Sequence, residues 1–273
     1  GRGITVGDAL INHKGVQAIS FTGGTATGKI IAQKTAASFK KLSLEMGGKN
    51  PAIIFPDCDY KKMLDTVVQS SFSNQGQICL SSSRILIQTE IFKQFKKDFI
   101  GKVAELIVGD PQNIGSDLGA VSSENHFEKI MNYIALAEKE GGKILWGGKA
   151  VKLNGRCKKG WFIKPTIIEG LTNAAKTNQE EIFGPVVTLI PFDNEEDAVQ
   201  IANESDYGLS ATIWTENEEK ANRVSNQVEA GVIWVNCWLV RDLRTPFGGM
   251  KQSGMGREGG SEALRFFTEQ KNV

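Results

Sequence analysis

Two segments of the sequence carry side chains that could together perform covalent chemistry on a carbonyl carbon. Cys79 follows Phe72-Ser-Asn-Gln-Gly-Gln-Ile78, a polar approach that contains a glycine. Glu45 lies earlier in the chain, at the end of the run Lys41-Leu-Ser-Leu44. A thiol is a strong nucleophile only as the thiolate, and a free cysteine with a pKa near ~8.5 is mostly protonated at neutral pH. A neighbouring carboxylate could take the proton of the thiol, or later that of a water attacking a thioester.

Both residues also have a simpler interpretation. Cysteine is among the most buried residue types, so a cysteine beside Ile78 and Leu80 is by default a core residue. The polar residues 74–77 are poor core material, however, and suit a loop where backbone approaches a ligand. Glu45 could be a solvated carboxylate at a helix end, but the run before it is typical of a strand. We therefore predict that Cys79 is a nucleophile and Glu45 a general base. The other cysteines are predicted to be core residues: Cys58, Cys157 and Cys237.

Composition excludes several classes of protein. The net charge of +1, from 32 basic and 31 acidic residues, gives no electrostatic footprint for nucleic acid or an anionic membrane. No apolar run is long enough to span a membrane. Four cysteines without C-x-x-C pairs and two histidines argue against disulfide and zinc sites, so we expect no metal, reduced thiols and a cytoplasmic location. The first residue is glycine, so an upstream segment with targeting signals is also expected to be absent from this sequence.

Strand and helix patterns alternate along the chain, which favours an α/β fold with a largely parallel sheet. Further strands are predicted after a first βαβ unit over residues 16–46, namely 52–55, 84–88, 162–168, 186–191, 209–214 and 231–236. Helices are predicted over 26–39, 60–73, 91–107, 125–140, 195–204 and 218–228. The glycine-rich stretch 241–260 is expected to be a long loop, and such loops usually serve a site.

A glycine-rich turn after the first predicted strand has the pattern of a phosphate-binding loop. Gly23-Gly-Thr-Ala-Thr-Gly28-Lys29 fits the core of a P-loop, but Ile30 follows where Ser or Thr is needed to hold magnesium. A P-loop nucleotide-binding protein is therefore a weak alternative. Gly23 and Gly24 still place free N–H groups and a positive helix end before an anion such as a dinucleotide pyrophosphate. A tight turn without a ligand stays open as an alternative.

From about Gly7 onward the chain resembles the C-terminal part of an aldehyde dehydrogenase. Five segments carry this resemblance, in the order of the family: Phe21–Thr25, Leu44–Lys49, Phe72–Cys79, Glu180–Pro185 and Pro246–Glu258. It implies an aldehyde-dehydrogenase-like α/β fold: a remnant of a Rossmann-type NAD-binding domain over 1–47 and a parallel-sheet catalytic domain over 48–252. Residues 253–273 would return to the cofactor domain and begin an oligomerisation tail. The resemblance also implies a fragment without the N-terminal half, from a parent that forms a homodimer or homotetramer.

The resemblance assigns roles to individual residues. Cys79 would form a thiohemiacetal and then a thioester with a small-molecule aldehyde, and Glu45 would activate the hydrolytic water. Glu258 would assist in proton relay. The cofactor would be NAD, with NADP not excluded, and a set of five residues would contact it: Gly23, Gly24, Met46, Glu181 and Phe183.

The segment after the last predicted strand is expected to select the substrate. Arg241, with Trp238 and Phe247 nearby, would line the substrate tunnel, and a guanidinium favours bidentate recognition of a carboxylate. The sequence of residues 236–247 resembles that of the muconic-semialdehyde dehydrogenase branch, which includes the 2-aminomuconic and 2-hydroxymuconic types. The substrate would then be a carboxylated semialdehyde. Alternatively, Arg241 pairs with Asp242 or a surface glutamate, and the whole chain could be a non-catalytic derivative kept for assembly.

Overall fold

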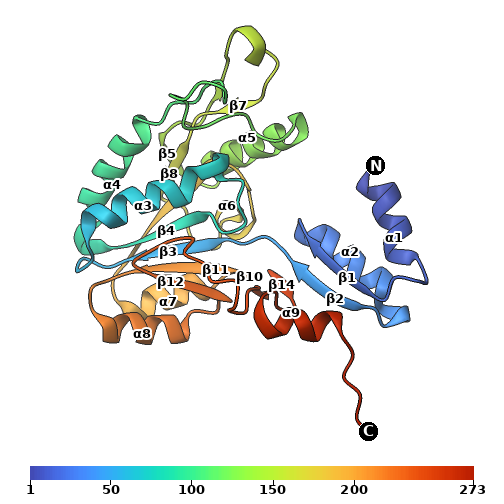
Figure 1. Ribbon diagram of the computed structural model, residues 1–273. Coiled ribbons are helices and arrows are strands. Elements are labelled where there is room, and N and C mark those ends of the chain that lie inside the picture. Colours follow the sequence, from blue (N-terminus) through green and yellow to red (C-terminus); the bar gives the residue numbers. More distant parts are fainter.

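Two sheets organise the computed structural model, which describes residues 1–273 (Figure 1). The larger sheet has seven strands in the order β12-β11-β3-β4-β9-β8-β5. Their bounds are β12 (Val232–Val235), β11 (Ser210–Trp214), β3 (Asn50–Ile54), β4 (Ser82–Gln88), β9 (Val186–Phe192), β8 (Thr166–Glu169) and β5 (Lys143–Trp146). All neighbours are parallel except β5, which runs antiparallel to β8. The predicted α/β fold with a largely parallel sheet is confirmed.

Helices cover both faces of this sheet. α3 (Tyr60–Phe72) and α4 (Thr89–Ala104) lie on one face, and α7 (Glu195–Asn203) and α8 (Glu218–Gln227) lie on the other (Figure 1). Successive residues of a strand point to opposite faces, so Ile54 packs under α3 and α4 while Ile53 packs under α7 and α8. Burial on both faces explains why the parallel strands are almost continuously apolar.

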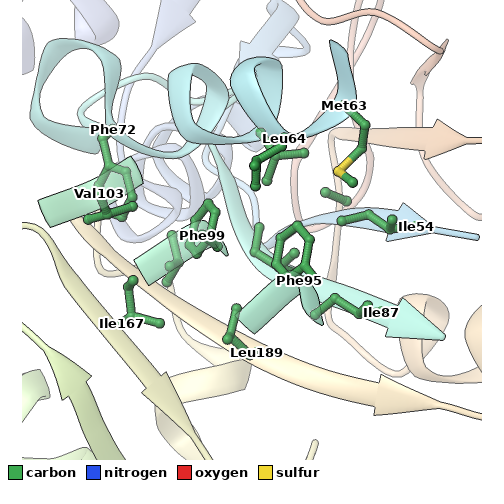
Figure 2. Close-up of a cluster of buried hydrophobic side chains, with 14 of the residues drawn as sticks. Ile54, Met63, Leu64, Phe72, Ile87, Phe95, Phe99, Val103, Ile167 and Leu189 are labelled. Atoms are coloured by element: carbon green, nitrogen blue, oxygen red, sulfur yellow. The ribbon is translucent and has the colours of Figure 1, made fainter. Parts of the chain in front are cut away.

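Aromatic side chains anchor α3 where it leads toward Cys79. Figure 2 shows Phe72, the last residue of α3, in one buried cluster with Phe99 and Phe95 of α4, with Phe99 between the other two rings. The rings of Phe95 and Phe99 are stacked with centroids 5.2 Å apart, and those of Phe72 and Phe99 are 6.2 Å apart. The chain therefore enters the loop before Cys79 from a fixed, fully buried residue.

The smaller sheet has three strands in the order β1-β2-β14. β1 (Ala18–Thr22) and β2 (Lys41–Glu45) are parallel, and β14 (Gly254–Met255) pairs antiparallel with β2. α2 (Thr25–Thr35) connects β1 to β2, and α1 (Asp8–Asn12) follows a π turn over Gly3–Gly7. The segment between β2 and β3 joins the two sheets (Figure 1).

Several predicted elements differ from the structure. The helix predicted over 26–39 ends at Thr35 and continues only as a 3-10 turn over Ala36–Ser38, and the helix predicted to reach residue 107 ends at Ala104. The strand predicted over 162–168 is two strands, β7 (Phe162–Ile163) and β8. Pro165 lies between them and lacks an N–H, and β7 pairs with β6 (Ala150–Val151) instead of the large sheet.

The stretch 241–260, expected to be a loop, contains short strands. β13 (Met250–Lys251) pairs with β10 (Tyr207–Gly208), and β14 adds to the small sheet. α9 (Gly260–Phe267) was not predicted, nor were β5, β6 and the single turn α6 (Lys176–Gln179). The helix predicted over 125–140 is α5 (Glu124–Lys139). No helix is both long enough and apolar enough to cross a bilayer.

Candidate active site

Gly76 allows the segment before Cys79 to pass close to the loop that contains Gly184. After α3 the chain makes a 3-10 turn over Ser73–Gly76, in which Asn74 and Gln75 are left-handed, with φ of 51° and 58°. Gly76 has a φ of 67°, and a Cβ there would lie 2.3 Å from the carbonyl oxygen of Gly184. Any other side chain at Gly76 would therefore displace one of the two loops.

Asn50, the first residue of β3, fixes the other side of the Cys79 loop. Its Nδ2 donates to the carbonyl oxygen of Cys79 at 2.7 Å and to that of Ser81 at 2.9 Å. Its Oδ1 accepts from the backbone N–H of Ser210 at 3.1 Å. The amide is buried with all these groups satisfied, so it ties the loop rigidly to the large sheet.

Aromatic residues surround the thiol. Cys79 packs against a buried cluster that includes Trp238 and Phe247, two residues predicted to bind substrate. The indole N–H of Trp238 donates to the carbonyl oxygen of Leu80 at 3.0 Å, which fixes the ring beside the loop. The structure thus brings Cys79, Trp238 and Phe247 together.

Glu45 is a buried carboxylate without a hydrogen-bond partner. It is the last residue of β2, its side chain is among the buried ones, and neither Oε atom accepts a hydrogen bond. Burial raises its pKa to about 7, and the charge of Glu258 adds to this, while Arg257 and Arg241 oppose it. A carboxylate with a pKa near the working pH is well suited to general-base chemistry. The predicted base therefore has the protonation behaviour that its role requires.

The Cys79 thiol also has a raised pKa. Burial is the largest cause, followed by the negative charges of Glu181 and Glu45. Its own backbone N–H and the charge of Arg241 act in the opposite direction. The thiol is therefore protonated at neutral pH and needs a base to become a nucleophile. Glu45, Glu181 and Arg241 therefore lie within electrostatic reach of the Cys79 thiol.

Glu181 lies against the glycine turn that follows Glu45. Its Oε1 accepts from the backbone N–H of Gly48 at 3.1 Å, and a Cβ on Gly47 would lie 2.0 Å from its Oε2. Burial raises the pKa of Glu181, although this bond and the nearby Lys129 and Lys49 lower it. Glu181 and Phe183 line one narrow cleft with Gly48 and Cys79. The segments around Gly48 and Glu181, more than a hundred residues apart in sequence, thus line the same cleft.

The glycine turn after β1 lies beside β2. The Gly23 N–H donates to the carbonyl oxygen of Glu45 at 3.0 Å, and Gly24 caps α2 with no side chain over the helix end. A Cβ on Gly24 would meet no atom within 4 Å, so the helix start is open to a ligand. Met46 lies under the same helix, where a Cβ on Gly28 would be 2.3 Å from its sulfur. Met46, which was predicted to contact the cofactor, therefore packs against α2 at Gly28.

Arg241 and Glu258 both contact Phe247. Arg241 is exposed and stacks on Phe247, with its guanidinium carbon 3.9 Å from the ring centroid. Asp242, considered as its partner, instead pairs with Arg244 at 2.5 Å. The backbone of Glu258 exchanges two hydrogen bonds with Phe247, at 2.7 and 2.8 Å. No group of three or more His, Cys, Asp or Glu residues is arranged to hold a metal ion.

Comparison with known proteins identifies the family. The profile of the aldehyde dehydrogenase family matches residues 1–273. This chain belongs to that family. It is 47% identical to the 2-aminomuconic semialdehyde dehydrogenase of Danio rerio over 100% of the chain and 56% of the relative. It is 44% identical to the 2-hydroxymuconic semialdehyde dehydrogenase of Pseudomonas sp. (strain CF600), over 98% of the chain and 55% of the relative.

Solved aldehyde dehydrogenases have the same fold. The betaine aldehyde dehydrogenase of Staphylococcus aureus, in complex with NAD+, superposes with a TM-score of 0.92 at 39% identity. The match covers 97% of this chain and 52% of that one. The chain thus spans about half the length of the aldehyde dehydrogenases it matches. The match to this family shows that the P-loop alternative is wrong. Lys29, the lysine of the P-loop pattern, donates to Oε1 of Gln252 at 2.9 Å.

Sequence reasoning did not single out every residue that shapes this aldehyde dehydrogenase site. Asn50 holds the Cys79 loop, and Arg257, which bonds to the carbonyls of Gly249 and Gly256, opposes the raised pKa of Glu45. The only signal for Asn50 was a polar residue at the start of an apolar strand. Nothing in the local sequence indicated the role of Arg257, because its contacts depend on how a glycine-rich loop folds.

Proposed function

We propose that this chain carries the nucleophile and the general base of an aldehyde dehydrogenase that oxidises an aldehyde to the carboxylic acid with NAD. The observation that supports this most is the Glu45 carboxylate. It is buried, accepts no hydrogen bond and has a pKa of about 7 within electrostatic reach of the Cys79 thiol. Burying such a group without a partner destabilises the fold, which is typical of a functional site.

Cys79 begins the reaction. Glu45 takes the thiol proton, and the thiolate attacks the aldehyde carbon to form a thiohemiacetal. The backbone N–H of Cys79, which already favours the thiolate, would donate to the developing oxyanion. NAD, when held by Glu181 and Phe183, would supply the acceptor for the hydride that leaves this carbon, which would leave a thioester on Cys79.

Glu45 completes the reaction. As the carboxylate it takes a proton from a water that attacks the thioester carbon, the C–S bond breaks to release the acid, and Glu45 returns this proton to the Cys79 thiolate. The proton that Glu45 took earlier from the thiol leaves before this step. Glu258, whose charge already acts on Glu45, would pass the proton outward. Trp238 and Phe247 keep the surroundings of the thiol apolar, which limits access of bulk water.

Residues of both sheets fit a dinucleotide. The open start of α2 at Gly23 and Gly24 suits a pyrophosphate, with Met46 packed beneath it. Glu181 and Phe183, in the cleft beside Cys79, would hold the nicotinamide ribose and ring. We propose NAD as the cofactor because the Staphylococcus aureus relative is described with NAD+. NADP is the alternative that a cofactor titration tests.

The proposed substrate is a semialdehyde that carries a carboxylate. Arg241 is exposed, has no carboxylate partner in the chain, stacks on Phe247 and acts electrostatically on Cys79. A guanidinium held this way suits the far carboxylate of a short substrate. The relatives named as 2-aminomuconic and 2-hydroxymuconic semialdehyde dehydrogenases support the same class.

Two further features of the parent protein are proposals. A cytoplasmic location agrees with four cysteines that are all free. A homodimer or homotetramer agrees with the exposed apolar side chains of α9, Leu264 and Phe267.

One experiment tests the proposed function. The protein that carries this chain is mixed with NAD, or with NADP, and with either a carboxylated semialdehyde or a neutral aldehyde of equal length. We expect reduced cofactor to form fastest with NAD and the carboxylated substrate, in equal amount to the acid produced. No cofactor reduction with any aldehyde, in a folded protein, would instead favour the non-catalytic derivative.

A further inference from the structure

Positive charge is concentrated in residues 141–168, here called the basic segment. It contains seven of the 32 basic residues of the chain and none of the 31 acidic ones. The rest of the chain therefore has 25 basic and 31 acidic residues, and a net charge of −6. Six of the seven are lysines, namely Lys143, Lys149, Lys152, Lys158, Lys159 and Lys164. The overall net charge of +1, which gave no sign of an anionic partner, hides this local excess.

The basic segment runs along the edge of the large sheet and into a projecting hairpin. β5 is the outermost strand of that sheet, and β6 pairs with β7 in the hairpin. Figure 1 shows the loop between β6 and β7 projecting from the body of the molecule, at the top of the view. Lys152, Lys158 and Lys159 lie in this loop, and all three are exposed. The positive charge therefore lies on a protrusion that a flat partner can reach.

The six lysines have no carboxylate partner. Arg156 pairs with Asp110 through two bonds of 2.7 Å, and this is the only ion pair in the basic segment. At the foot of the hairpin Lys149 and Lys164 lie opposite each other, since the N–H of Lys164 donates to the carbonyl oxygen of Lys149 at 3.0 Å. Like charges opposite each other destabilise a strand pair, so stability of the fold does not explain why both positions are basic.

The chemistry of the basic segment fits a broad anionic surface better than a nucleic acid or a peptide. Lysine carries a point charge without the planar fork by which arginine recognises nucleic acids. Trp146 carries the ammonium of Lys164 on its ring, 4.2 Å from the centroid, and Trp161 packs against the buried cluster under α5. Neither ring is free to stack on a base. The pairing of β5 is irregular between Ile144 and Trp146, a feature that keeps edge strands from adding a peptide strand.

We propose that the basic segment attaches the protein reversibly to membranes that contain anionic phospholipids. The ammonium groups of the projecting loop would lie against the lipid phosphates and carboxylates, and no apolar side chain needs to enter the bilayer. Clusters of four to eight basic residues are typical of this kind of electrostatic attachment. The attachment is independent of the proposed dehydrogenase activity, so either can fail without the other.

The test measures binding of the whole protein that carries this chain to lipid vesicles by co-sedimentation. Vesicles of phosphatidylcholine alone are compared with vesicles that also contain about 30% phosphatidylserine, to supply the negative surface potential. The tip variant combines Lys152→Gln, Lys158→Gln and Lys159→Gln. A charge-keeping variant replaces the same three lysines by arginine.

A matched control removes the same amount of charge elsewhere. It combines Lys61→Gln on α3 with Lys93→Gln and Lys97→Gln on α4, three exposed lysines without ion pairs. The Tm of every variant is measured, and it should equal that of the wild type because only exposed side chains change.

We expect the wild type to bind the anionic vesicles and not the neutral ones at about 0.15 M salt, and to be released at about 1 M, where the Debye length falls from about 8 Å to about 3 Å. Each lysine lost should weaken binding about fivefold, so the tip variant should bind roughly a hundredfold more weakly. The charge-keeping variant and the control should bind as the wild type does.

The inference would be overturned if the wild type bound both kinds of vesicle equally, or neither. Equal losses in the tip variant and the control would also overturn it, since net charge and not the basic segment would then govern binding. A short labelled DNA duplex serves as the competing polyanion. If it bound more tightly than the anionic vesicles and lost this binding in the tip variant, the basic segment would belong to a nucleic-acid site instead.

Discussion

The two sheets differ in how completely their strands are covered. In the seven-stranded sheet, β3 is buried throughout and β4 is buried except at Ser83 and Gln88, and sixteen buried residues pack on one face alone. In the three-stranded sheet, β1 is half-exposed, and the buried core consists of Ile31, Leu44 and Met46. The same chain therefore contains one thoroughly packed layer and one thinly packed layer.

Each sheet positions one of the two side chains that we propose to react. Cys79 enters from the packed sheet, between the aromatic core behind Phe72 and the amide of Asn50. Glu45 is the last residue of β2 in the three-stranded sheet, and its carboxylate accepts no hydrogen bond. Gly248 lies close to this carboxylate, and the charge of Glu258 raises its pKa. The Cys79 loop is held by packing and hydrogen bonds, whereas the buried Glu45 carboxylate accepts no hydrogen bond. Substitutions on the two sides should therefore have different consequences.

The largest expected effect is the loss of the thiol. Cys79→Ala in the protein that carries this chain should lower aldehyde oxidation by at least about four decades, as removal of a catalytic nucleophile does. Tm and NAD binding should be retained, because Cys79 is a loop residue in a site held by other contacts. Cys237→Ala is the control, since Cys237 borders the same aromatic cluster. Activity of Cys79→Ala within tenfold of wild type would contradict the assignment.

The next effect concerns the substrate. Arg241→Ala should lower kcat/KM for a carboxylated semialdehyde by about 30- to 4,000-fold, from roughly 2–5 kcal/mol for a charge pair that becomes buried when the substrate binds. A neutral aldehyde of similar length should be affected far less, and Arg241→Lys should recover only part, because it lacks the planar fork. Arg244→Ala is the matched control, as Arg244 already pairs with Asp242. Equal losses for charged and neutral aldehydes would mean that Arg241 holds the loop and not the substrate.

A pair of phenylalanines tests the contrast in packing itself. Phe99 is fully buried in the large core, whereas Phe39 is 93% exposed after α2. Phe99→Ala should lower the free energy of unfolding by about 3–5 kcal/mol, and Phe39→Ala should change it by less than about 0.5 kcal/mol. Urea denaturation measures both. Similar losses of unfolding free energy in the two variants would contradict the difference in packing between the two sheets.

The smallest effect is a gain in stability. The pKa of Glu45 is raised from 4.5 to about 7 on folding, so the folded state favours the protonated form. That stability is present below pH 4.5 and is lost as the pH rises through 7. Glu45→Gln, which cannot ionise, should therefore be more stable than wild type at pH 8 by roughly 1–3 kcal/mol, with little difference at pH 4. Identical pH dependence of urea denaturation for the two proteins would show that Glu45 is not desolvated.

Local patterns predicted much of this fold. The apolar runs at Ala52–Phe55 and Val186–Pro191 are long enough and regular enough to identify strands, and helical periodicity located α3 and α5. The division of 162–168 into two strands was missed, although Pro165 marked it, since the apolar pattern runs across the proline. The order of strands in the sheets follows from packing between distant segments, which a single sequence does not show.

The site was predictable only in part, for the same reason. Motif residues such as Cys79 and Glu45 stand out because a polar or glycine-rich context interrupts an apolar pattern. The contact of Glu181 with Gly48 and that of His126 with Phe183 join segments far apart in the chain. Such contacts depend on tertiary packing, and no local pattern encodes them.

The most direct test of the central claim is to trap the acyl group in the Glu45→Gln variant. Without the base, hydrolysis of the thioester should slow by roughly two to four decades. At alkaline pH, where the Cys79 thiol can ionise without Glu45, we expect one equivalent of NADH in a burst, followed by slow turnover, and a mass increase equal to the acyl group on the peptide that contains Cys79. A burst with the acyl group on Cys237 or Cys58, or steady turnover at the wild-type rate, would contradict the assignment of Cys79 and Glu45 as nucleophile and base.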